Sequence, residues 1–364
     1  MQLQRYDAAV LGGGPAGAAA AIALARAGVR TALVHRRDRG GFPVGEGLPP
    51  TARPLLRELG VAGRFDAGGH LPSYGNRSAW GTPALMTTDF IRHRHGLGWH
   101  LDRAAFDSML RDAAAEQGAD VVVCERVVSA NRDQPGWSID LAGAQNIRAR
   151  FAIDATGRSS WLARRAGATR VDNDALMAYV AVVDAKPDDT DSMTLVESAE
   201  SGWWYTALLP GGRRVVVFHT DADLVTRDFA TMLGETNHVR ARCGDAANTA
   251  TTIRRANGAR LDRFTGDGWA AAGDAAVSFD PLSSQGIMTA LYGGLRAAAA
   301  VAATLGGDGN ALGAYAAALD SIHIAYRHQH ETAYAAERRW QDRPFWSRRT
   351  SFGAIGRTLA VANG

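Results

Sequence analysis

Lysine is almost absent from this sequence of 364 residues: Lys186 is the only one, so arginine supplies nearly all of the 40 basic side chains. A guanidinium stays protonated, so no side-chain amine that could lose a proton precedes residue 186. Cysteine is also scarce, because Cys124 and Cys243 are the only two and stand far apart. Their spacing fits neither a thiolate zinc site nor a disulfide framework, so we predict no metal site and a reducing compartment.

Long apolar runs and a strong net charge are missing as well. No stretch of about 18 uncharged apolar residues occurs, and the opening MQLQRYDAAVLGGG has no apolar core of a signal peptide. We therefore predict no membrane span and a cytoplasmic protein. The net charge of +3 falls short of the basic footprint of a nucleic-acid binder, and the hydrophobic content of 46% is that of an ordinary globular core.

What is present begins with a βαβ pattern. An apolar strand is predicted at 6–11, an alanine-rich helix at 16–27 that ends at Gly28, and a second strand at 29–34. The strand in FAIDATG should rejoin the same parallel sheet. The other elements predicted outside the β-rich region are a helix at 101–117, a strand at 121–124, a hairpin around 137–141, a strand at 269–272, a helix at 286–303 and a helical tail at 311–339.

From residue 176 the sequence changes to β runs, with PGG turning GWWYTALLP and RRVVVFHT into a hairpin. The predicted fold class is α/β: a Rossmann-like cofactor-binding domain with an inserted antiparallel β-sheet substrate domain and a C-terminal helical segment. The predicted boundaries are 1–78, 99–175 and 263–305 for the cofactor domain, 79–98 and 176–262 for the substrate domain, and 306–364 for the C-terminal segment.

Three glycines follow the first strand in the pattern G-x-G-x-x-G, at Gly12, Gly14 and Gly17. The first glycine suits the tight turn, the second lets a pyrophosphate approach the backbone, and the third lets the helix pack on the sheet. Pro15 suits a first helical turn, and the helix N-terminus attracts an anion. Because a strand precedes the motif and a helix follows it, we predict dinucleotide binding.

The acid expected at the end of the second strand is replaced by His35. A neutral imidazole can still bond a ribose hydroxyl, and Arg36 and Arg37 could reach a phosphate. Alternatively, His35 is a solvated strand end and Asp38 binds the ribose. The adenosine end is therefore less predictable than the diphosphate.

A second motif, GDAAVSFDPLSSQG at 273–286, ends an apolar strand and opens an alanine-rich helix. Ser283 or Ser284 could simply cap that helix. Together with the glycine turn, LDRAAFDSML and FAIDATGRSS, however, the stretch resembles the flavoprotein monooxygenase and halogenase superfamily, whose FAD-binding fold resembles that of para-hydroxybenzoate hydroxylase. The resemblance covers most of residues 1–300 and implies that the cofactor domain binds FAD.

By this resemblance, Asp274 accepts the ribityl hydroxyl, the loop 281–286 bends over the isoalloxazine, and GGFPVGEGLPP borders the flavin. Reduced flavin carries negative charge around N1 and O2, which the free amides of a helix start would stabilise. The residues implied to bind the cofactor are Gly12, Gly14, Pro15, Ala16, Gly17, His35, Arg36, Glu46, Arg103, Asp154, Gly157, Gly273, Asp274, Pro281, Gly286 and Ile287.

The branches of the superfamily differ in chemistry. Halogenases use a lysine within the first hundred residues and a W-x-W-x-I-P stretch, and this sequence has neither. Relatives of geranylgeranyl reductase share W-H-L-D-R-x-x-F-D, and the run Trp203, Trp204 and Tyr205 could line an apolar channel for an isoprenoid. The combination VGEGLPP, GWWYTALLPGG and FDPLSSQG looks most like flavoproteins that oxygenate a peptidyl tryptophan during maturation of cysteine tryptophylquinone enzymes.

The resemblance thus implies an FAD-dependent monooxygenase that hydroxylates an electron-rich aromatic ring through a flavin C4a-hydroperoxide, with O2 as co-substrate. The substrate would be an aromatic small molecule or a tryptophan of a partner protein. Only one dinucleotide turn is present, so the flavin would be reduced by transiently bound NAD(P)H or by a separate reductase. A flavin-holding accessory protein that mainly binds a partner is a further alternative.

No catalytic side chain is identified from the sequence. The candidates near the flavin are Glu46, Pro281, Ser283, Ser284, Gln285 and Gly286, and those on the substrate side are His93, His95 and Trp204. Alternation would place His93 and His95 on one face of a strand, although a solvated edge explains IRHRHGLGWH as well. The segment RRWQDRPFWSRR at 338–349 could dock an acidic partner or fold its aromatic side chains onto the core.

Overall fold

The computed structural model describes residues 4–37, 40, 42, 44–133, 136–243 and 249–350. Its N-terminal lobe is built on an eight-stranded sheet in which β1, β2, β8, β11 and β20 are parallel neighbours, in the order β20-β11-β1-β2-β8. The predicted return of FAIDATG to the parallel sheet is confirmed, because β11 pairs with β1. The parallel strands are β1 (Gln4–Leu11), β2 (Thr31–Arg36), β8 (Asp120–Cys124), β11 (Ile147–Asp154) and β20 (Trp269–Ala271).

Antiparallel strands complete this sheet: β19 (Thr265–Gly266) pairs with β20, and β10 (Gly136–Ala142) joins β11 to β9 (Arg126–Asp133). Helix α1 (Pro15–Arg26) packs against α8 (Gly286–Leu305). Their separation is small because α1 presents alanines, and a Cβ at Gly294 would overlap the carbonyl oxygen of Ala16.

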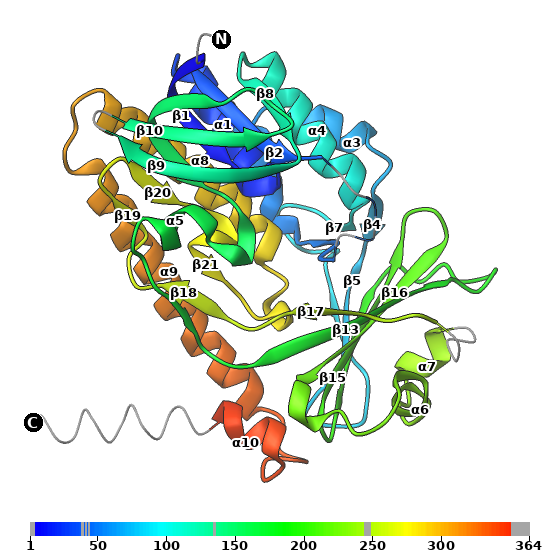
Figure 1. Cartoon of the computed structure of the whole chain (residues 1–364). Helices are drawn as coiled ribbons and strands as arrows, with labels where there is room; N and C mark the ends of the chain where they lie inside the picture. Colours follow the sequence, from blue (N-terminus) through cyan, green and yellow to red (C-terminus); the bar gives the residue numbers. More distant parts are fainter. Residues whose placement is uncertain are drawn as a thin grey trace, which may run out of the picture.

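The second lobe is a seven-stranded sheet in the order β17-β13-β16-β15-β14-β5-β6, in which only the β14–β5 pair is parallel. The predicted β runs and the PGG hairpin are confirmed. In Figure 1 this sheet lies below and to one side of the N-terminal lobe. Its strands are β5 (Gly75–Ala79), β6 (Met86–Asp89), β13 (Leu176–Asp184), β14 (Thr194–Ala199), β15 (Gly202–Leu209), β16 (Arg213–Asp221) and β17 (Thr252–Arg255).

Shorter elements connect the lobes. Two three-stranded sheets are formed by β3 (Gly47–Leu48), β7 (Gly98–His100) and β4 (Leu71–Ser73), and by β12 (Arg170–Asp172), β18 (Ala259–Leu261) and β21 (Val277–Ser278). The remaining helices are α2 (Arg53–Glu58), α3 (Ala62–Ala67), α4 (Arg103–Glu116), α5 (Trp161–Arg165), α6 (Phe229–Gly234), α7 (Val239–Arg242), α9 (Ala311–Ala335) and α10 (Pro344–Thr350). The domain boundaries given above stay a prediction.

The C-terminal helices join the two lobes. Helix α9 runs along the molecule from the N-terminal lobe to the seven-stranded sheet, where α10 follows (Figure 1). The predicted tail is therefore shorter than expected, since α9 ends at Ala335. Phe345 and Trp346 are fully buried, and Trp346 donates a hydrogen bond to the Ala199 carbonyl at 3.0 Å. These two aromatic side chains of the 338–349 segment thus fold onto the core.

Helix α8 is the one described helix long and apolar enough to cross a membrane by length and composition alone. It carries Arg296, and 56% of its most apolar window is buried inside the protein. Core helices share these properties, so its length and hydropathy are weak support for a span.

Candidate functional site

The turn between β1 and α1 leaves room for a ligand at one position only. Gly12 has a φ of 121°, and a Cβ there would overlap the Ala155 carbonyl, while a Cβ at Gly17 would overlap the Gly12 carbonyl. By contrast, no atom lies within 4 Å of a Cβ added at Gly14, which is the N-cap of α1 and has no side-chain cap. The open side of Gly14, at a helix start with free amides, fits a diphosphate.

A second segment lies against the start of α1. Gly273 has a φ of 60°, and a Cβ there would come within 2.7 Å of the Ala16 Cβ. This close approach places Asp274 beside the glycine turn, 260 residues away in the sequence. The Asp274 carboxylate, about a third exposed, lies 3.5 Å from the Arg158 Nε. Burial raises the pKa of Asp274, and the charges of Arg158, Arg170 and Arg103 oppose that rise.

The loop before α8 does not cap the helix as the sequence suggested. The N-cap is Gln285, and neither Ser283 nor Ser284 supplies a side-chain cap. Ser284 has a φ of 51°, in the left-handed region, which turns the chain into the helix. The first amides of α8, from Gly286 and Ile287 onward, are therefore free for another acceptor, as the flavin assignment requires.

Arg103 holds the segment that precedes Glu46. Its Nη1 donates hydrogen bonds to the carbonyls of Val44 at 3.1 Å and Gly45 at 2.6 Å, and its guanidinium pairs with Asp107 at 3.2 Å. Gly45 has a φ of 93°, which the tight path of the chain requires. Arg103 thus acts on both Glu46 and Asp274. Burial raises the pKa of each carboxyl, and the positive charge of Arg103 opposes that rise.

The residues at the predicted adenosine end lie at the strand ends. His35 is the last residue but one of β2, its Nδ1 is 3.0 Å from the Arg36 carbonyl oxygen, and a Cβ at Gly13 would meet its ring. Arg36 is exposed. Asp38, the alternative ribose ligand, lies outside the described residues.

Asp154 accepts its hydrogen bonds from the turn that follows it and from α5. It is fully buried and accepts from the Thr156 amide at 2.9 Å, the Thr156 hydroxyl at 2.6 Å and the Ala163 amide at 2.8 Å. Gly157, with a φ of 66°, continues that turn. These contacts shape the end of β11 beside the glycine turn, since the Ala155 amide bonds the Leu11 carbonyl at 2.9 Å.

The three substrate-side candidates are not brought together. His93 and His95 lie in turns after β6, not on a strand, with ring centroids 5.6 Å apart. The strand ends early because Asp89 bonds the Ile91 amide at 2.6 Å. Trp204 is buried against Phe218, on the opposite face of β15 from Trp203 and Tyr205.

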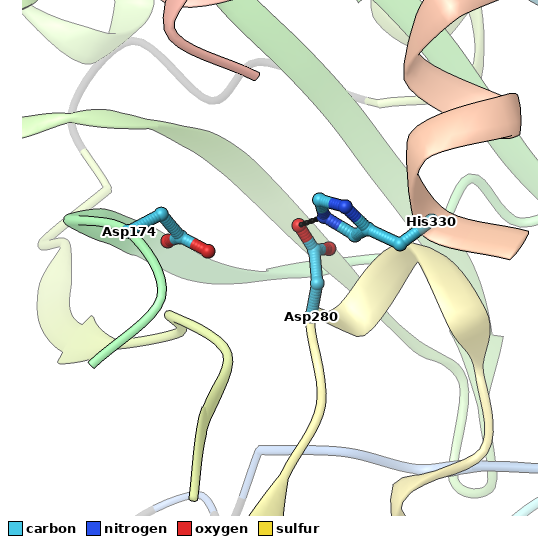
Figure 2. A group of neighbouring side chains, drawn as sticks. All are labelled: Asp174, Asp280 and His330. Atoms are coloured by element: carbon cyan, nitrogen blue, oxygen red, sulfur yellow. Dashed lines mark hydrogen bonds and ion pairs between the residues drawn. The ribbon is translucent and has the colours of Figure 1, made fainter. Parts of the chain in front are cut away.

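A buried polar cluster that the sequence did not predict forms at Asp280, one residue before the flavin loop. Asp280 is fully buried and accepts hydrogen bonds from Tyr334 at 2.8 Å and from the Leu282 amide at 2.9 Å, and its carboxylate pairs with the His330 Nε2 at 3.1 Å. Figure 2 shows His330 reaching Asp280 from α9, with Asp174 opposite. Burial alone would raise the pKa of Asp280, but these donors and the His330 charge lower it.

Asp174, Asp280 and His330 offer ligand atoms within 4.8 Å of one another, which is compatible with a metal ion. The environment does not favour one. The oxygens of Asp280 are already used by three donors, and the Arg349 guanidinium lies 4.0 Å from Asp174. The helical spacing of His330 and Tyr334 on the tail was the only sequence signal that could have linked these residues.

Comparisons with known proteins agree with this geometry. The family described as FAD binding domain matches residues 5–318. LodB of Marinomonas mediterranea, described as a FAD-dependent oxidoreductase, is 29% identical over 97% of this chain and 99% of its own length. The solved structure of the peptidyl tryptophan dihydroxylase QhpG is 26% identical with a TM-score of 0.79, over 95% of this chain and 78% of that one.

Halogenases are also among the relatives. The 1H-pyrrole-2-carbonyl-[peptidyl-carrier protein] brominase of Pseudoalteromonas luteoviolacea is 25% identical over 85% of this chain and 80% of its own length.

Proposed function

The chain belongs to the FAD-binding-domain family of flavoproteins, and on that premise we propose that this FAD-dependent oxidoreductase is a monooxygenase that hydroxylates a tryptophan side chain of a partner protein. The observation that carries the proposal is the likeness to a peptidyl tryptophan dihydroxylase over 95% of the chain. The cofactor half of the proposal also has support in the open side of Gly14 and the free amides of α8.

The chain's own residues would have distinct tasks. The α1 start at Gly14 would bind the FAD diphosphate, Asp274 would accept the ribityl hydroxyl, and the α8 start at Gly286 would face the N1 and O2 side of the ring. Bound FAD, once reduced, supplies the activation of O2. The protein must then exclude water and hold the indole in place, so a strong general base is not required.

Halogenation is less well supported because the sole lysine is placed elsewhere. Lys186 follows β13, and its Nζ donates a hydrogen bond to the Ala241 carbonyl of α7 at 2.7 Å. It is therefore engaged with α7, whereas the flavin elements are α1 and α8. No other side chain supplies the nucleophilic amine that carries hypohalous acid.

The test has two stages. The visible spectrum of the purified protein and the mass of its released cofactor should show oxidised FAD; a colourless protein that takes up no FAD would contradict the cofactor assignment. With NAD(P)H, alone or with a flavin reductase, and a candidate partner protein, O2 consumption should accompany a mass gain of whole oxygen atoms on the partner's tryptophan. A gain of two hydrogens would indicate a reductase, and no change would indicate an accessory binder.

A further inference from the structure

Four polar side chains from separate elements lie between the cofactor lobe and the seven-stranded sheet. They form two hydrogen-bonded pairs, Glu46 with Tyr205 of β15 and Thr194 of β14 with His100 of β7. Glu46 is 2% exposed and His100 is 1% exposed. The Glu46 Oε1 accepts a hydrogen bond from the Tyr205 hydroxyl, and its Oε2 accepts one from the Gly45 amide at 3.2 Å. The cofactor assignments use neither Tyr205 nor His100.

The proton positions at the His100 end follow from its partners. His100 Nδ1 lies 2.8 Å from the Leu208 carbonyl oxygen, which can only accept, so Nδ1 carries the hydrogen. Burial lowers the pKa of His100 to about 4, so the ring is neutral and its Nε2 is an acceptor. The Thr194 hydroxyl, 3.1 Å away, therefore donates to Nε2 and keeps its own lone pairs free.

Tyr205 connects Glu46 to the Thr194 side chain. Its hydroxyl bonds Glu46, and Thr194 lies near enough to oppose the rise in the pKa of the phenol. When Glu46 is ionised, the phenol donates to the carboxylate. When Glu46 is protonated, the carboxyl can donate to the phenol oxygen, and the phenol proton can rotate toward Thr194. The carboxyl of Glu46 therefore has a partner in both protonation states.

We propose that Glu46 is a proton carrier of the flavin site, and that Tyr205 and Thr194 are positioning residues that let it change protonation state without leaving a buried polar group unpaired. This inference rests on the proposed monooxygenase function. It assigns the chain a means of supplying and accepting a proton during oxygen transfer.

Glu46 has the right place in the fold for that task. The next strand, β3, contacts α8, and the Thr51 hydroxyl lies 3.0 Å from the Met288 Sδ in the first turn of α8. Glu46 is therefore linked to the same helix start that is assigned to the flavin ring. Arg103, which binds the carbonyl before it, also acts on Asp274.

The overall reaction needs such a group. Inserting one oxygen atom of O2 into an aromatic C–H bond and reducing the other to water consumes two electrons and two protons. The two electrons and the two protons enter with reduced FAD, counted as FADH2. Within the oxygen transfer itself, one proton can pass from Glu46 to the oxygen that becomes water, and the proton that leaves the hydroxylated ring carbon can return to Glu46, so the carrier ends as it began.

The charged and titratable groups around Glu46 set its equilibrium. Burial raises the pKa of Glu46, while the Tyr205 hydrogen bond, the Gly45 amide and the Arg103 charge oppose the rise. The nearby Arg214 is paired with Asp189 at 2.7 Å, and His100 is neutral. Removing the Tyr205 hydroxyl should therefore raise the pKa of Glu46, because that donor favours the ionised carboxylate.

The test is infrared difference spectroscopy of the FAD-bound protein, oxidised minus dithionite-reduced, across a pH series and without the aromatic substrate. Wild type should show a carboxylic-acid C=O band that changes on reduction. Glu46→Gln should lose it. Tyr205→Phe should keep it, shifted to higher frequency by the lost hydrogen bond and titrating at higher pH, and Thr194→Val should change it less.

Matched controls are Glu197→Gln, a buried glutamate that bonds the start of α7, and Tyr179→Phe, a tyrosine of the same sheet; both should leave the band unchanged. A band that persists in Glu46→Gln, or a wild type without one, would overturn the proposal. If Glu46→Gln does not hold FAD, an unshifted band in Tyr205→Phe overturns it equally. If the C=O band responds to the variants as expected but no oxygenated product forms, only the monooxygenase function is contradicted. If the wild-type protein does not bind FAD, both the monooxygenase function and the proton-carrier proposal are contradicted.

Discussion

The two sides of the cofactor region are lined by different kinds of residue. The side formed by α1, α8 and the Gly273 segment consists of backbone and small side chains, and at Gly12 and Gly17 a single added carbon would overlap a carbonyl. The side toward the seven-stranded sheet has buried ionisable side chains among apolar ones, and Glu46 and Asp280 are examples. On the first side there is no room for a larger side chain, whereas on the second side each buried polar group needs a hydrogen-bond partner. Substitutions should therefore destabilise the protein by steric overlap on the first side and by loss of hydrogen bonds on the second.

The sharpest test of this difference lies within the glycine turn. Gly17→Ala should cost about 3 kcal/mol of unfolding free energy, because its Cβ would overlap the rigid Gly12 carbonyl. Denaturant unfolding measures the loss. Gly14→Ala is the matched control: its Cβ meets no atom, so stability should hold while FAD affinity falls. Equal stability of the two variants would contradict the steric account.

On the side toward the seven-stranded sheet, Asp280→Ala should lower the free energy of unfolding by about 3 kcal/mol, because it leaves Tyr334 and His330 without their buried acceptor. Thermal unfolding of the two proteins checks this. Glu331→Ala removes a half-exposed partner of Arg327 on α9, the helix that also carries His330 and Tyr334. It should change the free energy of unfolding by less than about 1 kcal/mol. A loss as large for Glu331 as for Asp280 would argue against the buried cluster as the source.

The carboxyl of Asp280 should also make the free energy of unfolding depend on pH. Because the folded pKa of Asp280 lies below its usual value, its contribution to stability is complete above about pH 4 and disappears as the pH falls through the folded pKa. The stability difference between wild type and Asp280→Asn should therefore shrink under acidic conditions. Unfolding midpoints measured from neutral to low pH would show it, and a constant difference would contradict the assignment.

A smaller effect is expected at the ribityl contact. Asp274→Ala should weaken FAD binding about tenfold to a hundredfold, the value of one charge-assisted hydrogen bond. Titration of the apoprotein followed by flavin fluorescence measures it. Asp267→Ala removes an exposed partner of Arg132 and should leave affinity unchanged. A variant that retains full affinity without Asp274 would exclude the ribityl role.

The smallest effect is expected at Trp204, which separates the two faces of β15. Trp204→Phe should cost about 1 kcal/mol through reduced packing on Phe218 and leave FAD affinity unchanged. Trp203→Phe should additionally lose the 2.9 Å hydrogen bond to the Tyr334 hydroxyl, which connects to Asp280. If FAD affinity changed in Trp204→Phe but not in Trp203→Phe, the conclusion that Trp204 lies on the face of β15 away from the cofactor lobe would be wrong.

The sequence by itself determined the cofactor fold, because its requirements are local. A tight turn, an approach of backbone to diphosphate and a close helix each demand glycine at a fixed offset, so Gly12, Gly14 and Gly17 could be interpreted without coordinates. The β runs were also evident, since alternation follows from the pleat. The same strand logic failed at His93 and His95, where Asp89 ends the strand through a hydrogen bond that pattern alone does not reveal.

Only the tertiary structure decided which side chains face one another across the two lobes. Glu46 and Tyr205 are 159 residues apart, and Asp280 meets Tyr334 across 54 residues. Such pairs leave no periodic signal, because a buried hydrogen bond depends on the crossing of elements and not on spacing along the chain. The face on which Trp203 and Trp204 each lie was likewise set by which side of β15 the cofactor lobe covers.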